Sequence, residues 1–472
     1  KTYRFFLMLP ALMSFGALLL LVVLSLINPF LAAIYLLAII ITTVVKAVGI
    51  AYHTTTGRSS MEAAQKVDWH ARLAQLEHPK KYLSQQIGND SDSFLYKDHI
   101  SNLEDVAAHP ESHPKPSEIY NVALIAAYNE SFDVLEPTIQ SLVETTYDKD
   151  HLIVTIAYEE RGGDDIHETV TRLEKLFAGK FKAFHIVKHP KDIPGEVKGK
   201  GGNITYAGKF LKQWLQSEGI DYSNVIVTTL DSDNRPHPTY FDYLTYEYIV
   251  RPDRKNLSYQ PICLFTNNIW DVPAPMRVVA TGNSFWNIIS SMRPHTLRNF
   301  ASHAQPMDAL VEMDFWSTRT IVEDGHQYWR SYFHFDGNYS VVPLYVPITQ
   351  DAVLSSTYMR TLKAQFIQLR RWAYGASDVP YVATMILRKD RKTPLGGSLA
   401  RWIRLLDSHV TLACIPILIA VGGWVPLLIN SESAHNIAAH QLPEVISRVH
   451  QFALIGLFIT VFVAFRMLPP HP

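Results

Sequence analysis

The most informative stretch of the sequence is Val225-Ile-Val-Thr-Thr-Leu-Asp231-Ser232-Asp233. Its first six residues are apolar or β-branched, which is typical of a buried strand. The two carboxylates that follow lie two residues apart at the exit of this strand. There they can hold a hard divalent cation through oxygen ligands and present it to phosphate oxygens. An isolated Asp-Ser-Asp is also typical of an ordinary polar turn, so its interpretation depends on the surrounding sequence.

Three other short apolar runs end in polar residues in the same way. They are Val122–Ala127, Leu152–Ala157 and Ala183–Val187. Helical stretches separate the runs, for example Val134–Glu144 and Asn203–Gln216. Strands that alternate with helices predict an α/β fold, with a mostly parallel sheet covered by helices on both faces. Ligands bind such sheets beyond the carboxyl ends of the strands, which is where the polar residues lie.

Charged residues are unevenly distributed along the chain. Asp, Glu, Lys and Arg make up 18% of the 472 residues, against roughly 25% in ordinary soluble domains. None of them occurs in Phe5–Val45, Ser408–Ser431 or Val449–Phe465. A transmembrane helix needs about 20 predominantly apolar residues, so these stretches are long enough to cross a membrane. We therefore predict membrane spans near 6–27, 30–50, 408–430 and 449–467.

Basic residues orient the predicted spans. The short links at 26–30 and 430–449 hold a single basic residue, Arg448. The opposite ends of the spans hold Lys1, Arg4, Lys46 and Arg466. Since Lys and Arg favour the cytoplasmic side, we expect an integral protein of the plasma or inner membrane with the block from about 53 to 405 in the cytoplasm.

The composition excludes several kinds of site. Of the two cysteines, Cys263 falls in the predicted cytoplasmic block and Cys414 in a predicted span. Neither a disulfide framework nor a cysteine zinc site is therefore expected. The 20 histidines include no His-Glu-x-x-His pair, and the net charge of −1 gives no electrostatic footprint for nucleic acid.

Two further polar motifs flank the Asp231 strand. Upstream, Lys198-Gly-Lys200-Gly-Gly-Asn203 opens a helical stretch with small residues and two cations. This suits a diphosphate that is approached by backbone N–H groups and ammonium charges, although a flexible surface turn is an alternative. No Ser or Thr follows Lys200, so the segment is not a Walker A loop. Downstream, Glu323-Asp324 ends another apolar run, and a carboxylate there can take a proton from an attacking hydroxyl.

A basic amphipathic helix is predicted from about Thr357 to Tyr374. Its apolar positions follow the helical period at Met359, Leu362, Phe366, Leu369 and Ala373. Positive charge comes from Arg360, Lys363, Arg370 and Arg371. Such a helix most often lies on the bilayer surface. That interpretation leaves Trp372 unexplained, because it stands beside Arg371 and one turn after Gln368.

Five motifs in this order resemble the membrane-integrated family 2 glycosyltransferases, the class of cellulose, chitin and hyaluronan synthases. They are Ala127-Tyr128-Asn129-Glu130, Lys198–Asn203, Asp231-Ser232-Asp233, Glu323-Asp324 and Gln368-x-x-Arg371-Trp372. The resemblance covers roughly residues 119–376. It implies a GT-A fold, which is a Rossmann-like mixed α/β sheet, together with a nucleotide-sugar donor and a divalent cation, Mg or Mn.

The resemblance assigns the matching residues to three groups. The donor side would comprise Tyr128, Asn129 and Glu130 at the nucleotide, Lys198, Lys200 and Asn203 at the diphosphate, Asp231 at the nucleotide-sugar, and Gln368 and Arg371 at the diphosphate end. The metal would be held by Asp233, with Asp231 beside it. The acceptor side would comprise Asp324 as general base, Glu323 as its orienting neighbour, and Trp372 stacked under the acceptor sugar.

Two departures from the family pattern affect these expectations. Val322 stands where the family usually has Thr. After the second strand, Glu159-Glu160 replaces the Asp that reads the nucleobase, with Asp164-Asp165 farther on. Glu159 is therefore the candidate for contacting the base, and the identity of that base is open, with a UDP-sugar as the expected donor.

The motifs divide the chain into five parts. These are two transmembrane helices (1–52), a charged helical linker region (53–118), the glycosyltransferase domain (119–350), amphipathic interface helices with the Gln-x-x-Arg-Trp motif (351–405) and two more transmembrane helices (406–472). The expected function is inverting transfer of a sugar to a growing polysaccharide by a membrane-embedded enzyme. One alternative is a transferase that adds one sugar to a membrane lipid carrier. An alternative of another class is a nucleotide-sugar sensor or transporter.

Overall fold

The computed structural model describes residues 1–85, 93–430 and 461–471, and the single residues Gln441, Glu444, Val445, Ser447, Arg448, Gln451 and Phe458. These residues form two compact units. The first, which we call the apolar-helix unit, comprises Lys1–Thr55 and Trp372–Leu468. The second, which we call the sheet unit, comprises Thr56–Arg371 and Pro469–Pro472.

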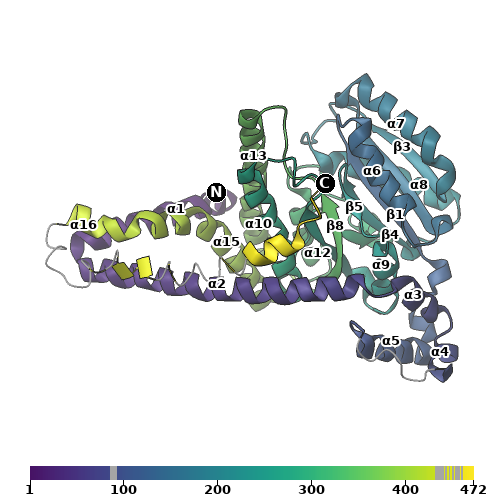
Figure 1. The fold of residues 1–472 in the computed structure, drawn as a ribbon, viewed down its shortest axis with the longest axis horizontal. Helices are drawn as coiled ribbons and strands as arrows, with labels where there is room; N and C mark the ends of the chain where they lie inside the picture. Colours follow the sequence, from purple (N-terminus) through teal and green to yellow (C-terminus); the bar gives the residue numbers. More distant parts are fainter. Residues whose placement is uncertain are drawn as a thin grey trace. The chain divides into compact units, whose positions relative to one another are not determined.

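The described part of the sheet unit contains one mixed sheet of eight strands. The strands are β1 (Tyr120–Ala127), β2 (Leu152–Glu159), β3 (Ala183–His189), β4 (Val225–Asp231), β5 (Arg235–Pro236), β6 (Leu257–Phe265), β7 (Ala304–Pro306) and β8 (Ser340–Gln350). They lie in the order β3-β2-β1-β4-β7-β6-β8-β5 (Figure 1). The pairs β1–β2, β2–β3, β1–β4 and β6–β8 are parallel, and β7 runs antiparallel to both of its neighbours. The predicted α/β class and its first four strands are confirmed.

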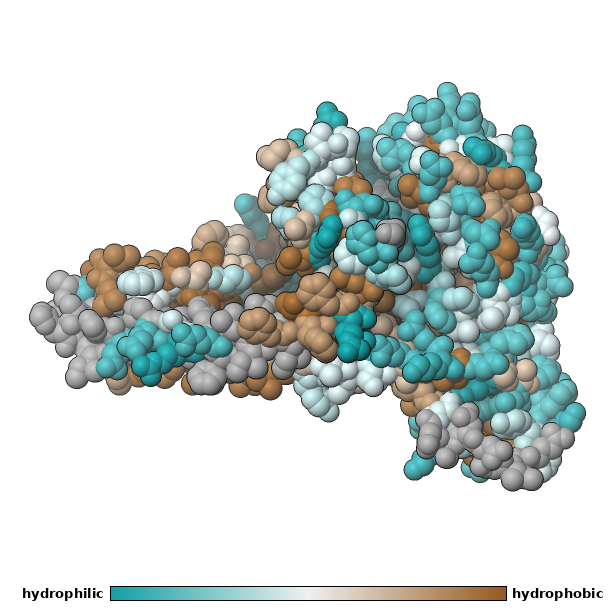
Figure 2. Space-filling view, in the orientation of Figure 1, coloured by the Kyte–Doolittle hydropathy of each residue, from teal (hydrophilic) through white to brown (hydrophobic). Residues whose placement is uncertain are grey.

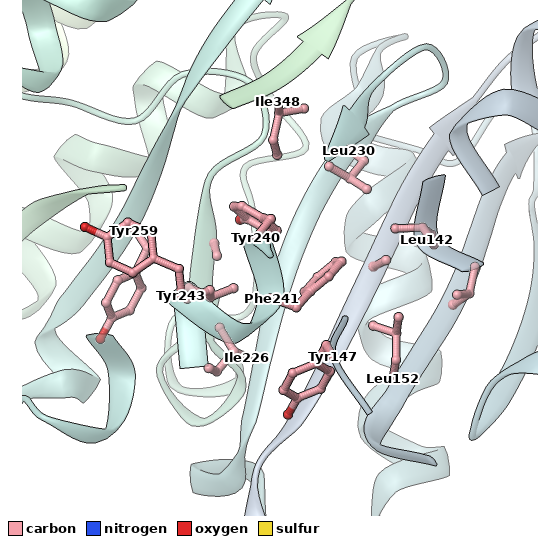
Figure 3. Close-up of a cluster of buried hydrophobic side chains, with 14 of the residues drawn as sticks. Leu142, Tyr147, Leu152, Ile226, Leu230, Tyr240, Phe241, Tyr243, Tyr259 and Ile348 are labelled. Carbon is pink, nitrogen blue, oxygen red and sulfur yellow. The ribbon is translucent and has the colours of Figure 1, made fainter. Parts of the chain in front are cut away.

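Helices cover both faces of the sheet. On one face lie α6 (Phe132–Val143), α7 (Asp164–Phe177) and α9 (Tyr240–Ile249), and on the other lie α8 (Lys200–Ser217) and α11 (Met307–Glu312). Alternate residues of β1 accordingly enter different cores: Ala123 and Ile125 belong to the first, Val122 and Leu124 to the second. Figure 3 shows part of the first core, with Tyr240 and Phe241 of α9 packed over β4. Burial on both faces explains why the central strands are almost continuously apolar.

The predicted charged helical region forms three helices of the sheet unit. They are α3 (Trp69–Glu77), α4 (Pro79–Gln85) and α5 (Tyr96–Ala108). The indole of Trp69 stacks on Tyr243 of α9 with the ring centroids 3.7 Å apart, and its N–H donates to the carbonyl of Ala64. These helices therefore pack onto the rest of the sheet unit.

Three further helices complete the described part of the sheet unit. They are α10 (Ala274–Ser291), α12 (Glu323–His334) and α13 (Tyr358–Ala373). The helix predicted at 357–374 is confirmed as α13, and the division between the two units falls inside it, after Arg371. Pro469, beyond the last apolar segment, returns to the sheet unit, where its carbonyl accepts the indole N–H of Trp270.

The apolar-helix unit contains the helices that the uncharged stretches predict. Its described elements are α1 (Thr2–Ile27), the first part of α2 (Pro29–Gln65), α14 (Asp378–Ile386), α15 (Leu395–Val421) and α16 (Val425–Ile429). Among the described residues, Thr2–Ile27, Pro29–Gln65 and Leu395–Ile429 are long and apolar enough to cross a membrane. Their exposed side chains are mostly apolar (Figure 2), as expected of a surface that faces lipid.

The boundaries of these helices differ from the predicted spans. α2 continues beyond residue 50 to Gln65, and α15 begins at Leu395, well before the predicted position 408. The extension of α2 is mainly polar and that of α15 mixes apolar with charged residues, so neither extends the uncharged stretch from which its span was predicted. The fourth predicted span, 449–467, lies largely outside the described residues. Leu21 and Leu36 pack with Cys414 and Leu418 in a buried cluster that joins α1, α2 and α15.

Candidate active site

The candidate site lies at the edge of the sheet where β1, β2 and β4 end. In the strand register, Ala126 of β1 lies opposite Asp231 of β4, and Ala127 lies opposite Tyr158 of β2. Because these strands are parallel, the polar residues that follow them come together at one edge. β1 is also where the strand order changes direction, and ligands of open α/β sheets bind at such switch points.

Lys200 connects two of the predicted acids. Its Nζ lies 2.8 Å from Oδ1 of Asp231 and 3.6 Å from Oδ2 of Asp324. Lys200 is the first residue of α8 and Asp324 lies in the first turn of α12, so the cluster brings together a strand end and two helix starts. Burial disfavours the charge on Lys200, but the surrounding carboxylates outweigh this effect and raise its pKa. The ammonium group is therefore held in its charged form.

A glycine permits this close approach of α8 to α12. A Cβ atom on Gly201 would collide with the backbone oxygen of Ser317 and lie 3.2 Å from Cβ of Glu323. Gly201 is itself buried inside the first turn of α8. The small residue after Lys200 thus allows the ammonium group to reach Asp324, which explains part of the Gly-rich pattern in physical terms.

The acids of the cluster differ in their protonation. Burial raises the pKa of Asp231, but the charge and hydrogen bond of Lys200 outweigh it and lower that pKa overall. Glu323 is only 4% exposed, and burial together with the charge of Asp324 raises its pKa. One carboxyl group is thus held ionised while its neighbour retains a proton more readily, a separation that is typical of acid–base sites.

Asp233 lies beside Asp351, which directly follows β8. The backbone N–H of Asp351 donates to Oδ2 of Asp233 at 3.0 Å. Burial, followed by the charges of Asp231 and Asp351, raises the pKa of Asp233 to about 7. Oδ1 of Asp351 is buried and has no hydrogen-bond partner among the described residues. Crowded carboxylates with an unsatisfied oxygen fit a divalent cation, which would relieve their repulsion.

The carboxylates alone do not complete a metal site. No group of three or more His, Cys, Asp and Glu side chains in the described residues could hold a metal ion. Mg²⁺ is commonly bound by one or two carboxylates together with phosphates of the substrate. Asp233 and Asp351 therefore fit a cation that arrives with a diphosphate.

Asn234 fixes the shape of the Asp231–Asp233 loop. Its buried Oδ1 accepts the backbone N–H of Asp231 at 2.9 Å, and its Nδ2 donates to Oδ1 of Asp233 at 3.1 Å and to Oε1 of Gln350 at 3.0 Å. The amide thus links the end of β4 to the end of β8. The backbone of Asp231 and the carboxylate of Asp233 are held by one side chain before any ligand binds.

The residues after β1 form an exposed turn. Oε2 of Glu130 accepts the backbone N–H of Tyr128 at 2.6 Å, so Glu130 stabilises the turn itself. The Tyr128 ring is 45% exposed, and Asn129 is also exposed. Asn203 is buried, and its Nδ2 donates to the carbonyls of Ala127 and Ala157, at the ends of β1 and β2. The substrate-binding roles of these residues remain predictions.

Glu159 is the centre of a buried polar network. Its carboxylate accepts Nε of Arg161 at 3.2 Å and lies 2.9 Å from the NH2 nitrogen of that guanidinium. Nδ1 of His189 lies 3.0 Å from the same carboxylate, and Nε2 of His189 lies 3.1 Å from Glu196. Glu159 is 3% exposed, whereas the Arg161 guanidinium lies 5.5 Å from the centre of the Tyr128 ring. Arg161 is therefore the member of this network that reaches the exposed tyrosine.

The remaining predicted residues are Lys198, Gln368, Arg371 and Trp372. Lys198 is exposed in the segment before α8. Gln368 accepts the side-chain N–H of Gln365 at 3.0 Å on α13, and the charge of exposed Arg371 contributes to the lowered pKa of Asp231. Trp372 belongs to the apolar-helix unit, so its role at the acceptor stays a prediction.

Several site residues were not predicted from the sequence. Asp351 follows an apolar strand, and the same strand-end rule that identified Asp231 could have found it. Arg161 directly follows Glu159-Glu160, and a basic residue after two acidic ones was the signal that could have found it. His303, whose Nδ1 lies 3.5 Å from Oδ1 of Asp324, directly precedes the three-residue strand β7, which is too short for a periodic signal.

No protein-family model matches the chain, and a comparison with curated proteins finds no match either. Solved structures that are similar include the mannosyltransferase PcManGT from Pyrobaculum calidifontis in complex with GDP-Man and Mn²⁺, at 15% identity and a TM-score of 0.41, covering 88% of this chain and 97% of that one. Another is residues 1–349 of S. aureus TarS in complex with UDP, at 10% identity and a TM-score of 0.40, covering 73% and 89%. A third is glucosyl-3-phosphoglycerate synthase from Mycobacterium tuberculosis, at 12% identity and a TM-score of 0.32, covering 59% and 80%.

Proposed function

We propose that this protein is a glycosyltransferase that moves a sugar from a nucleotide-sugar donor to an acceptor hydroxyl. The observation that supports this most strongly is the Lys200 cluster, in which one cation connects a strand-end acid, Asp231, to a helix-start acid, Asp324. A diphosphate needs positive charge, and an attacking hydroxyl needs a base. The cluster offers both within one ion-paired group at the ligand-binding edge of the sheet.

On the donor side, the diphosphate would lie between Lys200 and the Asp231–Asp233 loop. Lys200 supplies an ammonium charge that stabilises the leaving diphosphate. A Mg²⁺ or Mn²⁺ ion held by Asp233 and Asp351 would supply further charge neutralisation there. Asn234 fixes the backbone of Asp231 and the carboxylate of Asp233, and Arg371 and Gln368 add polar groups from α13. The exposed Tyr128 ring offers a surface on which the base can stack.

On the acceptor side, Asp324 would accept the proton of the attacking hydroxyl. Its Oδ2 lies beside Lys200, so the base and the diphosphate-binding cation are only 3.6 Å apart in the free protein. Attack from the face opposite the diphosphate breaks the anomeric C–O bond as the new bond forms, and it inverts the anomeric configuration. Glu323 orients the neighbourhood of Asp324, and Trp372 would stack under the acceptor sugar.

The acceptor we propose is a growing polysaccharide at the membrane. The apolar helices and the basic amphipathic helix α13 would keep the transfer site close to the bilayer surface. A transferase that adds one sugar to a lipid carrier would use the same catalytic groups. The two acceptors differ in product length, which mass spectrometry of the product measures directly.

The proposal is tested by replacing the base. Purified protein in detergent is incubated with Mg²⁺ or Mn²⁺ and with UDP-glucose, UDP-N-acetylglucosamine or GDP-mannose, and released nucleoside diphosphate and product mass are recorded together. Asp324→Asn is expected to lower transfer by roughly 100-fold or more, because general base catalysis contributes about that much, while binding of UDP or GDP persists.

Asp314→Asn is the matched control. Asp314 is an exposed acid that pairs with Lys209 at the protein surface, and its left-handed backbone suits Asn. This variant is expected to keep full activity. An Asp324→Asn enzyme as active as this control would remove Asp324 from its role. Absence of turnover with every donor, despite nucleotide binding, would favour a sensor.

A further inference from the structure

His303 is a fully buried histidine in contact with the proposed base. Its side chain is 0% exposed, and its Nδ1 lies 2.9 Å from the carbonyl oxygen of Phe300 and 3.5 Å from Oδ1 of Asp324. On the other side of the ring, Nε1 of Trp316 lies 3.4 Å from Nε2 of His303. The ring therefore stands between a buried tryptophan and the carboxylate.

The contact with Trp316 determines which ring nitrogen carries the proton. An indole N–H can only donate, so Nε2 of His303 must be the acceptor. In the neutral ring the proton is then on Nδ1, where it faces two oxygens, the Phe300 carbonyl and Oδ1 of Asp324. Burial lowers the pKa of His303, which keeps the ring neutral. His303 thus presents one N–H, in one tautomer, to the side of Asp324 away from Lys200.

The backbone at this point is held in an uncommon conformation. Ser302, which precedes His303, has φ +67°, in the left-handed region that non-glycine residues rarely adopt. Its hydroxyl donates to Oδ1 of Asn234 at 2.6 Å, and the carbonyl of His303 accepts the backbone N–H of Thr229 at 3.1 Å. The same turn thereby connects the Asp231–Asp233 loop to Asp324. Strained backbone held by such contacts is typical of functional sites.

We propose that His303 is a positioning residue for Asp324, and that Trp316 sets its tautomer. Nδ1 of His303 faces Oδ1 of the carboxylate at 3.5 Å, which leaves Oδ2 as the oxygen presented to Lys200 and to the acceptor hydroxyl. Oδ1 is buried and has no hydrogen-bond partner among the described residues. A diphosphate would draw Lys200 away from Asp324, and the His303 contact would then remain to orient the base. This inference rests on the proposed function, since it acts through Asp324.

Three substitutions separate this role from simple packing. In His303→Asn the amide N–H takes the place of Nδ1–H, whereas in His303→Gln it reaches the position of Nε2. Trp316→Phe keeps an aromatic ring but removes the indole N–H, so that His303 can carry its proton on either ring nitrogen. We expect kcat to stay within about 3-fold of wild type in His303→Asn and to fall about 10-fold or more in His303→Gln. The expected fall is smaller than that from losing Asp324, because a misoriented base keeps part of its catalytic effect.

The pH dependence of kcat provides a readout that a packing defect would not change. A hydrogen bond donated to a carboxylate favours its charged form. Its loss in His303→Gln and Trp316→Phe is therefore expected to move the acidic limb of the kcat profile to higher pH, while His303→Asn leaves it in place. The other charged groups that face Asp324 are Lys200 from α8, Glu323 from α12 and Asp231 from β4, and all three variants retain them.

Folding and donor binding are measured in the same preparations. Binding of UDP or GDP with Mn²⁺ is expected to be nearly unchanged, since none of the variants replaces a residue of the Lys200 cluster. Thermal stability is expected to fall in all three, because each replaces a fully buried side chain. Equal kcat values and equal pH profiles for His303→Asn and His303→Gln would overturn the inference. If both His303 variants fail to fold, the acidic limb of the Trp316→Phe profile is the deciding measurement. A limb that stays at its wild-type position overturns the inference. An active Asp324→Asn enzyme would instead overturn the proposed function itself.

Discussion

His189 is a buried residue whose charge is expected to contribute to stability. Burial alone would lower its pKa, but the carboxylates of Glu159 and Glu196 on either side of the ring raise the pKa overall. The folded protein thus binds this proton more tightly than the unfolded chain does. The resulting stabilisation is fully present below the ordinary His pKa of about 6.5 and is lost as the pH rises through the folded value.

We therefore expect the thermal stability advantage of wild type over His189→Gln to be larger at pH 6 than at pH 8.5. His185, on the same strand, is a matched control with the opposite sign, because burial lowers its pKa and its protonation opposes folding at low pH. Melting temperatures of wild type, His189→Gln and His185→Gln, measured in one detergent at both pH values, test both effects. An advantage of wild type over His189→Gln that is independent of pH would show that His189 is not charged in the folded protein.

At the scale of single residues, the sequence identified which side chains can take part in chemistry. It did not identify which residues those side chains contact. The acids Asp231, Asp233 and Asp324 stood out because each follows an apolar run. Glu159 stood out for the same reason, but its carboxylate is occupied by Arg161 and His189. Whether a strand-end acid faces a ligand or a neighbouring cation depends on residues distant in sequence, and that information is not local.

At the scale of elements, the start of α8 depends on the absence of a side chain at Gly201. Gly201→Ala would force Cβ against the backbone of Ser317. We expect a loss of about 1–3 kcal/mol of stability from this overpacking, together with weaker binding of UDP or GDP with Mn²⁺ as Lys200 shifts. Thermal unfolding and calorimetric titration measure the two effects.

Gly282→Ala is the control for helical glycine. It lies in α10, and a Cβ there meets no atom within 4 Å. Alanine is expected to stabilise this helix by up to about 1 kcal/mol and to leave nucleotide binding unchanged. If Gly201→Ala behaves like Gly282→Ala, the close approach of α8 and Ser317 does not position Lys200.

The elements that could be predicted are those with a long, regular pattern. β1 to β4 and α13 follow from apolar runs and from the helical period, and they lie where the sequence places them. β7 has three residues, too few for any period, and yet it brings His303 to the site. The start of α12 at Glu323 was expected only as the end of an apolar run, because no Ser, Thr, Asp or Asn stands at the N-cap position, which is Val322.

At the scale of the whole molecule, the predicted orientation of the sheet unit can be tested with cysteine labelling. The native Cys263 and Cys414 are 2% and 3% exposed, so they should give little background. Asn28→Cys, in the link between α1 and α2, is expected to react with a membrane-impermeant maleimide in intact cells. Lys97→Cys, on α5, is expected to react only after permeabilisation. The reverse pattern would place the sheet unit outside the cytoplasm.

Long-range pairing is what sequence reasoning could not supply at this scale. Asp233 with Asp351, and Asp324 with His303, join segments that no local pattern connects. The compact units are likewise discontinuous, since each combines an early and a late part of the chain. In the sequence, only the alternation of charged and uncharged stretches predicts the division into two units.

The buried cluster of Leu21, Leu36, Cys414 and Leu418 has a consequence for biosynthesis. α1 and α2 leave the ribosome long before α15, and the entire sheet is translated in between. At about 5–20 residues per second, the first two helices wait in the bilayer for roughly half a minute before their partner exists. During that interval all eight strands have been translated while the buried cluster still lacks Cys414 and Leu418, so the insertion machinery or lipids must cover the faces of α1 and α2 that α15 later occupies.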